Sequence, residues 1–324
     1  MLAAKDLRGV MGMMPAFTTA DGGDLRAKAT IDVAALRAGV DRIIGDGIDV
    51  IATTGSFGEF HTLLWDEHKT LIEATVGAVK SRVPVFIGCT SLNTRETLEK
   101  MEFIAKSGAD GVLVGVPHYF PSTVENASQF YKDVAAAFPR LAIMVYHNPP
   151  LHHVKLPESM FAELAKIPNI VAMKDSHRDT QRFMRLQEVT GGKISVFCNQ
   201  AQLYPYAMLG AAGCWSIHAW MGPSPIIRMR DACRAGDWEA AKKICMDVAQ
   251  VFAGGPITGD LRWRESSIKL AMNEAGYCRP GPLRPPFRVV PDAVREAAKE
   301  MAAKWTELCR RYPLQAAAPR HAAE

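Results

Sequence analysis

Short apolar segments alternate with amphipathic segments along most of the chain, and this alternation constrains the fold more than any other feature. The apolar segments have the length and composition of buried strands, and the segments between them place apolar residues at helical spacing. Eight strands alternating with helices predict a (β/α)8 barrel, in class α/β, rather than an open doubly wound sheet. The expected strands are residues 9–16, 48–53, 83–88, 111–116, 141–146, 170–174, 194–198 and 213–217. Expected helices between them include residues 31–45, 65–79, 94–107, 126–138 and 157–166.

The pattern becomes purely helical after Pro225, with expected helices at 238–252, 261–275 and 291–312. We therefore expect residues 1–230 to form the barrel and residues 231–312 to form a C-terminal helical extension of the same domain. Residues 313–324 carry few anchors for a core and are expected to be a mobile tail. The phosphate-binding fingerprints GxGxxG and GxxxxGK[ST] are missing, which disfavours the usual nucleotide-binding enzymes.

Composition excludes several other classes of protein. A chain of 324 residues with 48% hydrophobic residues can bury a large core. No apolar run approaches the about 18 residues that span a bilayer, and we expect a cytoplasmic protein without membrane contact. The net charge of +4 is small and its basic residues are interspersed with acids, so nucleic-acid binding is not expected. The cysteines are odd in number and form no CxxC pair, which argues against disulfides and a metal site: Cys89, Cys198, Cys214, Cys233, Cys245, Cys278 and Cys309.

Lys174 stands at the end of the apolar segment 167–175. A charged side chain is rarely buried without a partner, so this ammonium either reaches solvent or lies in a site that keeps it partly neutral. A neutral lysine amine attacks carbonyl carbons. Lys174 is therefore a candidate Schiff-base nucleophile, although most lysines at strand ends simply point into water.

Tyr146 ends the preceding expected strand and is followed by His147-Asn148-Pro149. The carboxyl ends of barrel strands all face one side of the molecule, where active sites are built. We therefore expect Tyr146 and Lys174 to share a pocket. The phenol of Tyr146 can donate and accept a proton, so Tyr146 is the acid–base candidate, and its hydroxyl can pair with that of Ser56.

The loop Thr53-Thr-Gly-Ser-Phe-Gly-Glu59 follows the second expected strand. Gly55 and Gly58 permit a tight turn whose backbone N–H groups point at one anion, although two glycines are also common in ordinary loops. Combined with Tyr146 and Lys174, this loop can hold the carboxylate of a 2-keto acid whose ketone carbon meets Lys174.

These three motifs, in this order and spacing, resemble the class I aldolase superfamily that includes dihydrodipicolinate synthase and N-acetylneuraminate lyase, over about residues 8 to 300. The resemblance implies that Lys174 forms a Schiff base with pyruvate or a related 2-keto acid. It also implies that Tyr146 relays protons with Ser56 and that the loop at residues 56–58 binds the carboxylate. The intermediate is covalent, so no metal or other cofactor is expected. A homotetramer is implied as well.

Departures from the superfamily patterns narrow the substrate. Ser56-Phe57 stands where dihydrodipicolinate synthases carry two threonines, and Leu151 stands where they place a carboxylate-binding arginine. The loop with Phe57 instead resembles the hydratase-aldolases that cleave benzylidenepyruvates, as do Trp65-Asp-Glu-His68, residues 83–88 and residues 92–95. Members of that group also tend to carry a tryptophan at the position of Trp215, whereas the segment Pro117-His-Tyr-Phe-Pro121 departs from their sequence pattern. Such enzymes hydrate and cleave an arylidene pyruvate to an aromatic aldehyde and pyruvate during aromatic-compound degradation.

The resemblance therefore predicts Lys174, Tyr146 and Ser56 as catalytic residues. The expected substrate-binding residues are Gly55, Phe57, Gly58, His118, Tyr119, Leu151 and Trp215. Two alternatives stay open: another pyruvate-dependent class I lyase or keto-acid dehydratase, similar to N-acetylneuraminate lyase, and a non-catalytic keto-acid-binding protein.

Several other residues are expected to be structural. His152 and His153 are adjacent, so on an extended loop their side chains diverge as ordinary surface histidines. Glu59 is expected to support the fold rather than act as a base. Trp215 and Trp220 are as consistent with core packing as with binding an aryl ring.

Overall fold

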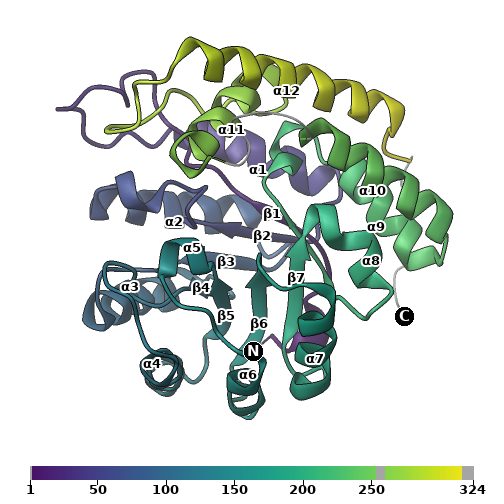
Figure 1. Cartoon of the computed structure of the whole chain (residues 1–324). Helices are drawn as coiled ribbons and strands as arrows, with labels where there is room; N and C mark the ends of the chain where they lie inside the picture. The colour runs from purple at the N-terminus through teal and green to yellow at the C-terminus, as the bar shows by residue number, and fades with distance from the viewer. Residues whose placement is uncertain (1, 253–259, 316–324) are drawn as a thin grey trace.

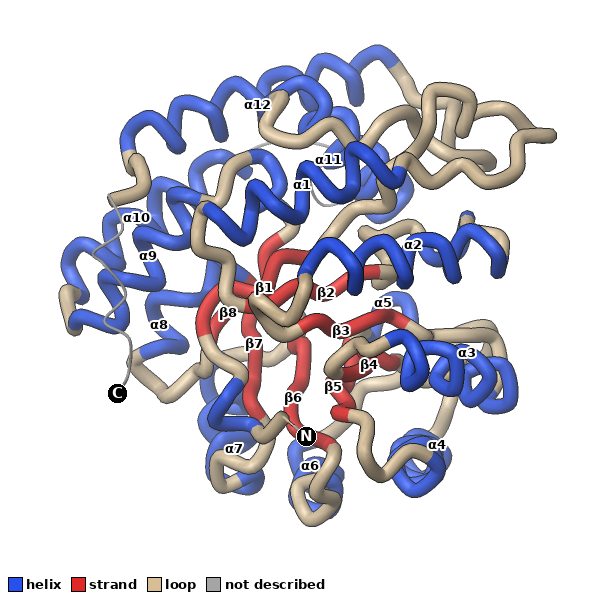
Figure 2. The backbone as a smooth tube through the Cα atoms, turned by 180° about the vertical axis from the view of Figure 1, so that it is seen from behind, coloured by secondary structure: helices blue, strands red, loops and turns tan. Residues whose placement is uncertain are grey.

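The computed structural model describes residues 2–252 and 260–315. Its eight strands form a closed parallel barrel in chain order, as the alternation predicts. Figure 2 shows the strands gathered in the centre with helices around them. The strands are β1 (Gly9–Met13), β2 (Val50–Thr53), β3 (Val85–Gly88), β4 (Gly111–Val114), β5 (Ala142–His147), β6 (Ile170–Asp175), β7 (Ser195–Asn199) and β8 (Gly213–Ser216).

Helices surround the barrel on the outside. The helices up to β7 are α1 (Val33–Gly45), α2 (Trp65–Val79), α3 (Thr94–Ser107), α4 (Val124–Ala137), α5 (Pro149–His152), α6 (Glu158–Leu164) and α7 (Thr180–Thr190). The later ones are α8 (Leu203–Ala207), α9 (Ser224–Ala235), α10 (Trp238–Phe252), α11 (Leu261–Ala275) and α12 (Asp292–Arg311). Short 3-10 turns are η1 (Ala4–Asp6), η2 (Phe60–Thr62), η3 (Gln200–Gln202) and η4 (His218–Met221). Figure 1 shows α12 extending across the layer formed by α10 and α11.

The strands are buried on both faces, which explains their nearly continuous apolar sequences. Alternation along each strand divides the core into two parts. One cluster fills the barrel interior and includes Met11, Phe86, Leu113, Met144 and Phe197. The larger cluster lies between the strands and the helices. Within the described residues, no helix is long and apolar enough to cross a membrane.

The register between β5 and β6 decides the geometry of the site. Tyr146 pairs with Lys174, and His147 pairs with Asp175 on the next rung. Tyr146 belongs to the cluster inside the barrel. Because successive side chains on a strand point to opposite faces, Tyr146 and Lys174 face the interior, and His147 and Asp175 face the helix layer.

Most of the expected elements are confirmed, with ends that move by a few residues. The expected strand at 9–16 ends at Met13, and the helix expected from residue 126 starts at Val124. Helices α7, α8 and α9 were not among those singled out from the sequence. Residues 316–324, most of the expected tail, lie outside the described residues.

The segment after β5 corrects one expectation. A one-turn helix, α5, replaces the expected extended loop, because Pro149 supplies a helical first residue and the His152 N–H donates to the Asn148 carbonyl at 2.8 Å. His152 is buried rather than a surface histidine, and its ring packs edge-on against Tyr146 with 4.8 Å between centroids. Gly115 makes room for this ring, since a Cβ there would lie 2.2 Å from it. His153 is exposed, as expected.

Candidate active site

A cavity of about 330 Å³ lies at the carboxyl ends of the strands. Five of the residues predicted for the site line it: Ser56, Phe57, Tyr146, Lys174 and Trp215. They come from the loop after β2 and from β5, β6 and β8, which a parallel barrel brings to one face. The structure therefore brings together side chains that are far apart in the sequence.

Lys174 is buried at the floor of this cavity, with 5% of its surface exposed. Its Nζ lies 3.9 Å from the Trp215 ring centroid and 4.5 Å from that of Tyr146. Burial lowers the pKa of Lys174, and the adjacent Tyr146 only partly opposes this shift. No carboxylate in the described part of the chain forms a salt bridge with it. Lys174 therefore loses its proton more readily than a surface lysine, as a Schiff-base nucleophile requires.

Tyr146 has two polar partners at its hydroxyl. Ser56 Oγ lies 3.0 Å from the phenol oxygen, as the sequence suggested. The Asn148 amide nitrogen donates to the same oxygen at 3.0 Å. Because Asn148 can only donate through this nitrogen, the phenol proton stays available for Ser56 or for a bound substrate. Asn148 is a cavity residue that the sequence analysis missed, although its place two residues after Tyr146 was a usable signal.

A hydrogen bond to the backbone of β6 holds the Trp215 side chain in place. Its indole Nε1 donates to the backbone carbonyl of Asp175 at 2.7 Å. Lys174 directly precedes Asp175 on β6, so this hydrogen bond holds the Trp215 ring against the Lys174 side chain. Because Trp215 is only partly buried and lines the cavity, part of its ring can contact a ligand.

A buried ionic network lies behind the two strand ends. Asp175 contacts His147 Nδ1 at 2.9 Å and Arg178 Nη1 at 3.0 Å. The Leu156 N–H donates to His147 Nε2, so His147 carries its proton on Nδ1 and donates it to Asp175. Burial acts to raise the pKa of Asp175, but the hydrogen bond from His147 and the charge of Arg178 outweigh it and lower that pKa. This network stabilises the register that pairs Tyr146 with Lys174.

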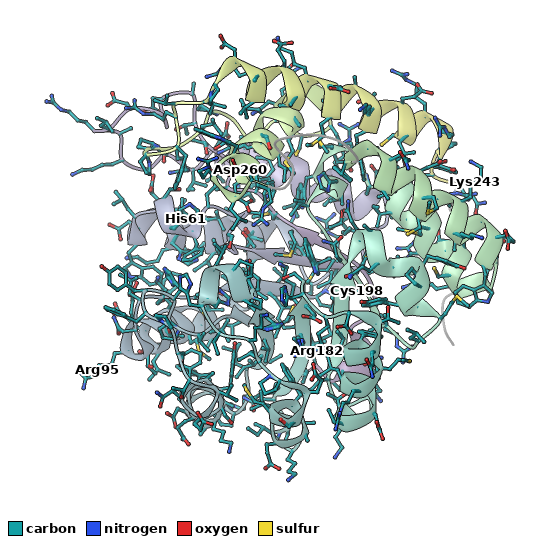
Figure 3. The ribbon with its side chains drawn as sticks, viewed as in Figure 1. His61, Arg95, Arg182, Cys198, Lys243 and Asp260 are labelled. Atoms are coloured by element: carbon teal, nitrogen blue, oxygen red, sulfur yellow. The ribbon has the colours of Figure 1, made fainter. Side chains whose placement is uncertain are left out.

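The opposite wall of the cavity comes from α11, which the sequence analysis did not connect with the site. Arg264, Glu265, Ser267 and Ile268 line it. Asp260, labelled in Figure 3, starts this helix by accepting from the Arg262 N–H at 2.9 Å. The sequence near these residues gives no sign that they line a cavity, because only the tertiary fold brings α11 over the barrel.

Gln200 and His218 line another part of the cavity and belong to a hydrogen-bonded row of side chains. Ser216 Oγ accepts from the Ala219 N–H and donates to Gln200 Oε1, and Gln200 Nε2 donates to His218 Nδ1 at 2.8 Å. His218 therefore carries its proton on Nε2. Burial lowers the pKa of His218 to about 3, so its ring stays neutral at physiological pH. This row adds polarity to the cavity without adding charge.

Other predicted site residues lie elsewhere. Tyr119 is 74% exposed and lines a separate surface groove with Phe120. His118 packs edge-on against Phe60, and Leu151 lies half-buried on α5. None of the three lines the cavity within the described chain. Their roles in binding stay predictions.

The two loop glycines lie beside the cavity rather than in its lining. A Cβ on Gly58 would lie 2.5 Å from the Thr54 backbone nitrogen, so glycine is required for the tight turn. A Cβ on Gly55 would touch Met13, Leu113 and Tyr146, all at ordinary contact distance. Among residues 2–252 and 260–315 no group of three His, Cys, Asp or Glu side chains is placed to hold a metal ion.

Comparison with known proteins identifies relatives of the whole chain. Residues 11–304 match the Dihydrodipicolinate synthetase family. The chain is 32% identical to a trans-O-hydroxybenzylidenepyruvate hydratase-aldolase of Pseudomonas aeruginosa, over 96% of both chains. It is 28% identical to a trans-2'-carboxybenzalpyruvate hydratase-aldolase of Nocardioides sp. (strain KP7), over 98% of both. A solved structure of PhdJ bound to a substrate intermediate superposes with a TM-score of 0.92 at 30% identity, covering 96% of this chain and 99% of that one.

Proposed function

This chain belongs to the dihydrodipicolinate synthetase family, and we propose that it is a hydratase-aldolase that cleaves an arylidene pyruvate to an aromatic aldehyde and pyruvate. The observation that carries the proposal is the burial of Lys174 between Tyr146 and Trp215 in a cavity at the strand ends. The similarity to hydratase-aldolases over nearly the whole chain supports the substrate class. The enzyme is a carbon–carbon lyase of the class I aldolase type.

Lys174 begins the proposed reaction. Its neutral amine adds to the keto carbon of Ar–CH=CH–CO–COO⁻, and loss of water gives an iminium ion. The iminium withdraws electrons through the conjugated double bond, so a water molecule adds at the carbon that bears the aryl group. Protonation of the resulting enamine at the neighbouring carbon then restores the iminium. Removal of the new hydroxyl proton breaks the carbon–carbon bond and releases the aldehyde. The remaining enamine is protonated and hydrolysed, which frees pyruvate and Lys174.

Tyr146 is the proposed proton carrier in these steps. Its oxygen lies within 3.0 Å of both Ser56 Oγ and Asn148 Nδ2. Asn148 donates to the oxygen and orients the phenol, while Ser56 can pass a proton on. We assign the substrate carboxylate to the backbone of residues 56–58, where the turn requires Gly58.

The two other candidate functions differ in what the cavity must hold. A lyase similar to N-acetylneuraminate lyase would need many polar partners, and Arg264 and Glu265 could supply some of them. A keto-acid-binding protein without catalysis would have no use for a buried lysine beside a hydrogen-bonded tyrosine.

The homotetramer and the cytoplasmic location implied by the resemblance are also part of the proposal. Light scattering measures the oligomeric state.

The pH dependence of adduct formation tests the Schiff-base step. Only the neutral amine attacks, and burial lowers the pKa of Lys174 from its ordinary value of 10.5. The attacking form therefore increases as pH rises toward the lowered pKa and is complete above it. We expect the rate of pyruvate adduct formation, trapped by borohydride and located on Lys174 by mass spectrometry, to rise with pH and level off below pH 10.5. An unmodified Lys174 would reject the Schiff-base mechanism.

Substrate preference tests the aryl assignment. Phe57 and Trp215 line the cavity, whereas Leu151, also expected there, does not. An aryl ring buried against these side chains should gain about 2 kcal/mol over a methyl group, or about thirtyfold in kcat/KM. We therefore expect 2-hydroxybenzylidenepyruvate, or a close aryl analogue, to be cleaved far faster than N-acetylneuraminate.

Loss of the conjugated chromophore, with lactate dehydrogenase detecting pyruvate, measures this preference. No condensation of aspartate semialdehyde with pyruvate is expected. Faster turnover of the sugar acid would reject the aryl assignment and leave the Schiff-base chemistry standing.

A further inference from the structure

Glu59 ends the loop proposed to bind the substrate carboxylate, but it does not line the cavity. Its carboxylate is buried and lies 2.6 Å from Nζ of Lys269, which is 210 residues later in the chain on α11. Lys269 is 2% exposed. Burial acts to raise the pKa of Glu59 and to lower that of Lys269, and their mutual attraction opposes both shifts. Two charged groups are rarely buried so completely unless they are paired, so this contact is a built feature of the fold.

The backbone around Glu59 shows why the loop needs such a partner. Thr54 and Glu59 both adopt left-handed backbone conformations, with φ of 47° and 53°. These conformations are unfavourable for residues other than glycine and persist when surrounding contacts hold them. The Glu59 N–H donates to the Ser56 carbonyl at 3.0 Å, which closes the turn across Gly58. A displacement of Glu59 would therefore move Ser56, the partner of Tyr146.

Lys269 is itself held on its other side. Its Nζ donates to Thr18 Oγ1 at 2.8 Å, and Arg284 Nε donates to the same oxygen at 3.2 Å. Arg284 also contacts Glu67 at 3.4 Å and donates to the Thr30 carbonyl at 2.8 Å. The two cations and two carboxylates balance in charge. The position of Lys269 is thus held by Thr18, and the loop contacts it through Glu59.

The same helix provides the opposite wall of the cavity. Glu265 precedes Lys269 by one helical turn, so the two side chains share a face of α11. Glu265 and Ile268 line the cavity, and Lys269 reaches past them to Glu59. The Glu59–Lys269 ion pair therefore links the loop at residues 56–58 to the helix that lines the cavity.

We propose that the Glu59–Lys269 pair positions the loop at residues 56–58 for binding the carboxylate of the 2-keto acid. Neither residue touches the reacting atoms, and both act through the backbone of the loop. This inference rests on the proposed function, because it concerns how the Schiff-base substrate is held. Loss of the pair should therefore weaken recognition of the carboxylate more than it weakens the nucleophilicity of Lys174.

The test compares a charged ligand with an uncharged one. Pyruvate carries the carboxylate, and methyl pyruvate presents the same ketone without the charge. In the double variant Glu59→Gln/Lys269→Gln, two amides replace the ion pair, so no buried charge is left unpaired. We expect borohydride trapping of pyruvate on Lys174 at subsaturating concentration to fall about 10- to 100-fold, since small misplacements of binding groups have effects of that size. Trapping of methyl pyruvate should change much less, so the preference for pyruvate falls by nearly the whole factor.

A matched control exists at the opposite end of β2. Asp49 directly precedes this strand and pairs with Arg230 of α9 at 2.6 Å. Asp49→Asn/Arg230→Gln removes a comparable ion pair between the start of β2 and the C-terminal helices, away from the loop at residues 56–58. This variant should lose stability and keep the preference for pyruvate.

Each outcome decides between the alternatives. An unchanged preference in the folded Glu59/Lys269 double variant would overturn the proposal, as would an equal loss in the control. If neither the double variant nor Glu59→Gln alone folds while the control does, the pair is a folding determinant and the positioning role is rejected. Absence of a pyruvate adduct in the unmodified enzyme would instead reject the proposed function itself.

Discussion

Replacement of Lys174 by alanine should abolish turnover while the fold persists. The variant loses the proposed nucleophile, and no other described lysine lines the cavity. Alanine leaves no buried charge unpaired, because Lys174 forms no salt bridge with a carboxylate among the described residues and its own ammonium is disfavoured by burial. We expect cleavage to fall to background, a loss of at least about 10⁴-fold, with no adduct after borohydride treatment.

Circular dichroism and the thermal midpoint establish that the Lys174→Ala protein is folded. Lys155→Ala is a suitable control, because this exposed lysine lies between α5 and α6 and its removal also changes the net charge by one. The control should retain full activity. Substantial residual cleavage by a folded Lys174→Ala protein would show that the covalent intermediate forms elsewhere or not at all.

The barrel could be predicted from the sequence because its signals are local. Each buried strand is a short apolar run, and each helix repeats its apolar residues at its own period. Lys174 and Tyr146 could be found for the same reason, since both interrupt such runs at the end where parallel strands place a site. What the sequence could not supply is the register that sets Tyr146 beside Lys174, which depends on pairing between strands.

The remaining parts of the site depend on long-range packing. Arg264 and Glu265 reach the cavity only because α11 lies against the barrel, and nothing near them in the sequence indicates this. Glu59 was expected to be structural, and nothing in the sequence indicated its partner Lys269, which lies 210 residues away. Contacts between residues so far apart produce no periodic pattern in a single sequence, so they could not be predicted from it.

Loop residues were placed less well than strand residues. His152 was expected at the surface, yet α5 turns its ring against Tyr146. Tyr119 and Leu151 were expected at the cavity and lie outside its lining. The path of a loop depends on its local turns and on its tertiary contacts, so strand periodicity gives no information about it.

Replacement of Tyr146 by phenylalanine should separate proton transfer from nucleophilic attack. The ring that packs 4.5 Å from Lys174 Nζ and against His152 is retained, and only the hydroxyl between Ser56 and Asn148 is lost. We expect kcat to fall by about 10² to 10⁴, the usual contribution of general acid–base catalysis. The pyruvate adduct on Lys174 should form slowly but remain detectable, because the amine is still present and still desolvated.

Tyr131→Phe is the matched control for this substitution. Tyr131 is buried on α4, and its hydroxyl donates to the Val114 carbonyl at 3.2 Å, outside the cavity lining. Its loss should lower the free energy of unfolding by about 1 kcal/mol and leave kcat unchanged. A reduced kcat in both variants would indicate a general effect of losing a buried hydroxyl. A near-normal kcat in Tyr146→Phe alone would move the proton relay away from Tyr146, and Ser56, 3.0 Å from the missing oxygen, would then be the first residue to test.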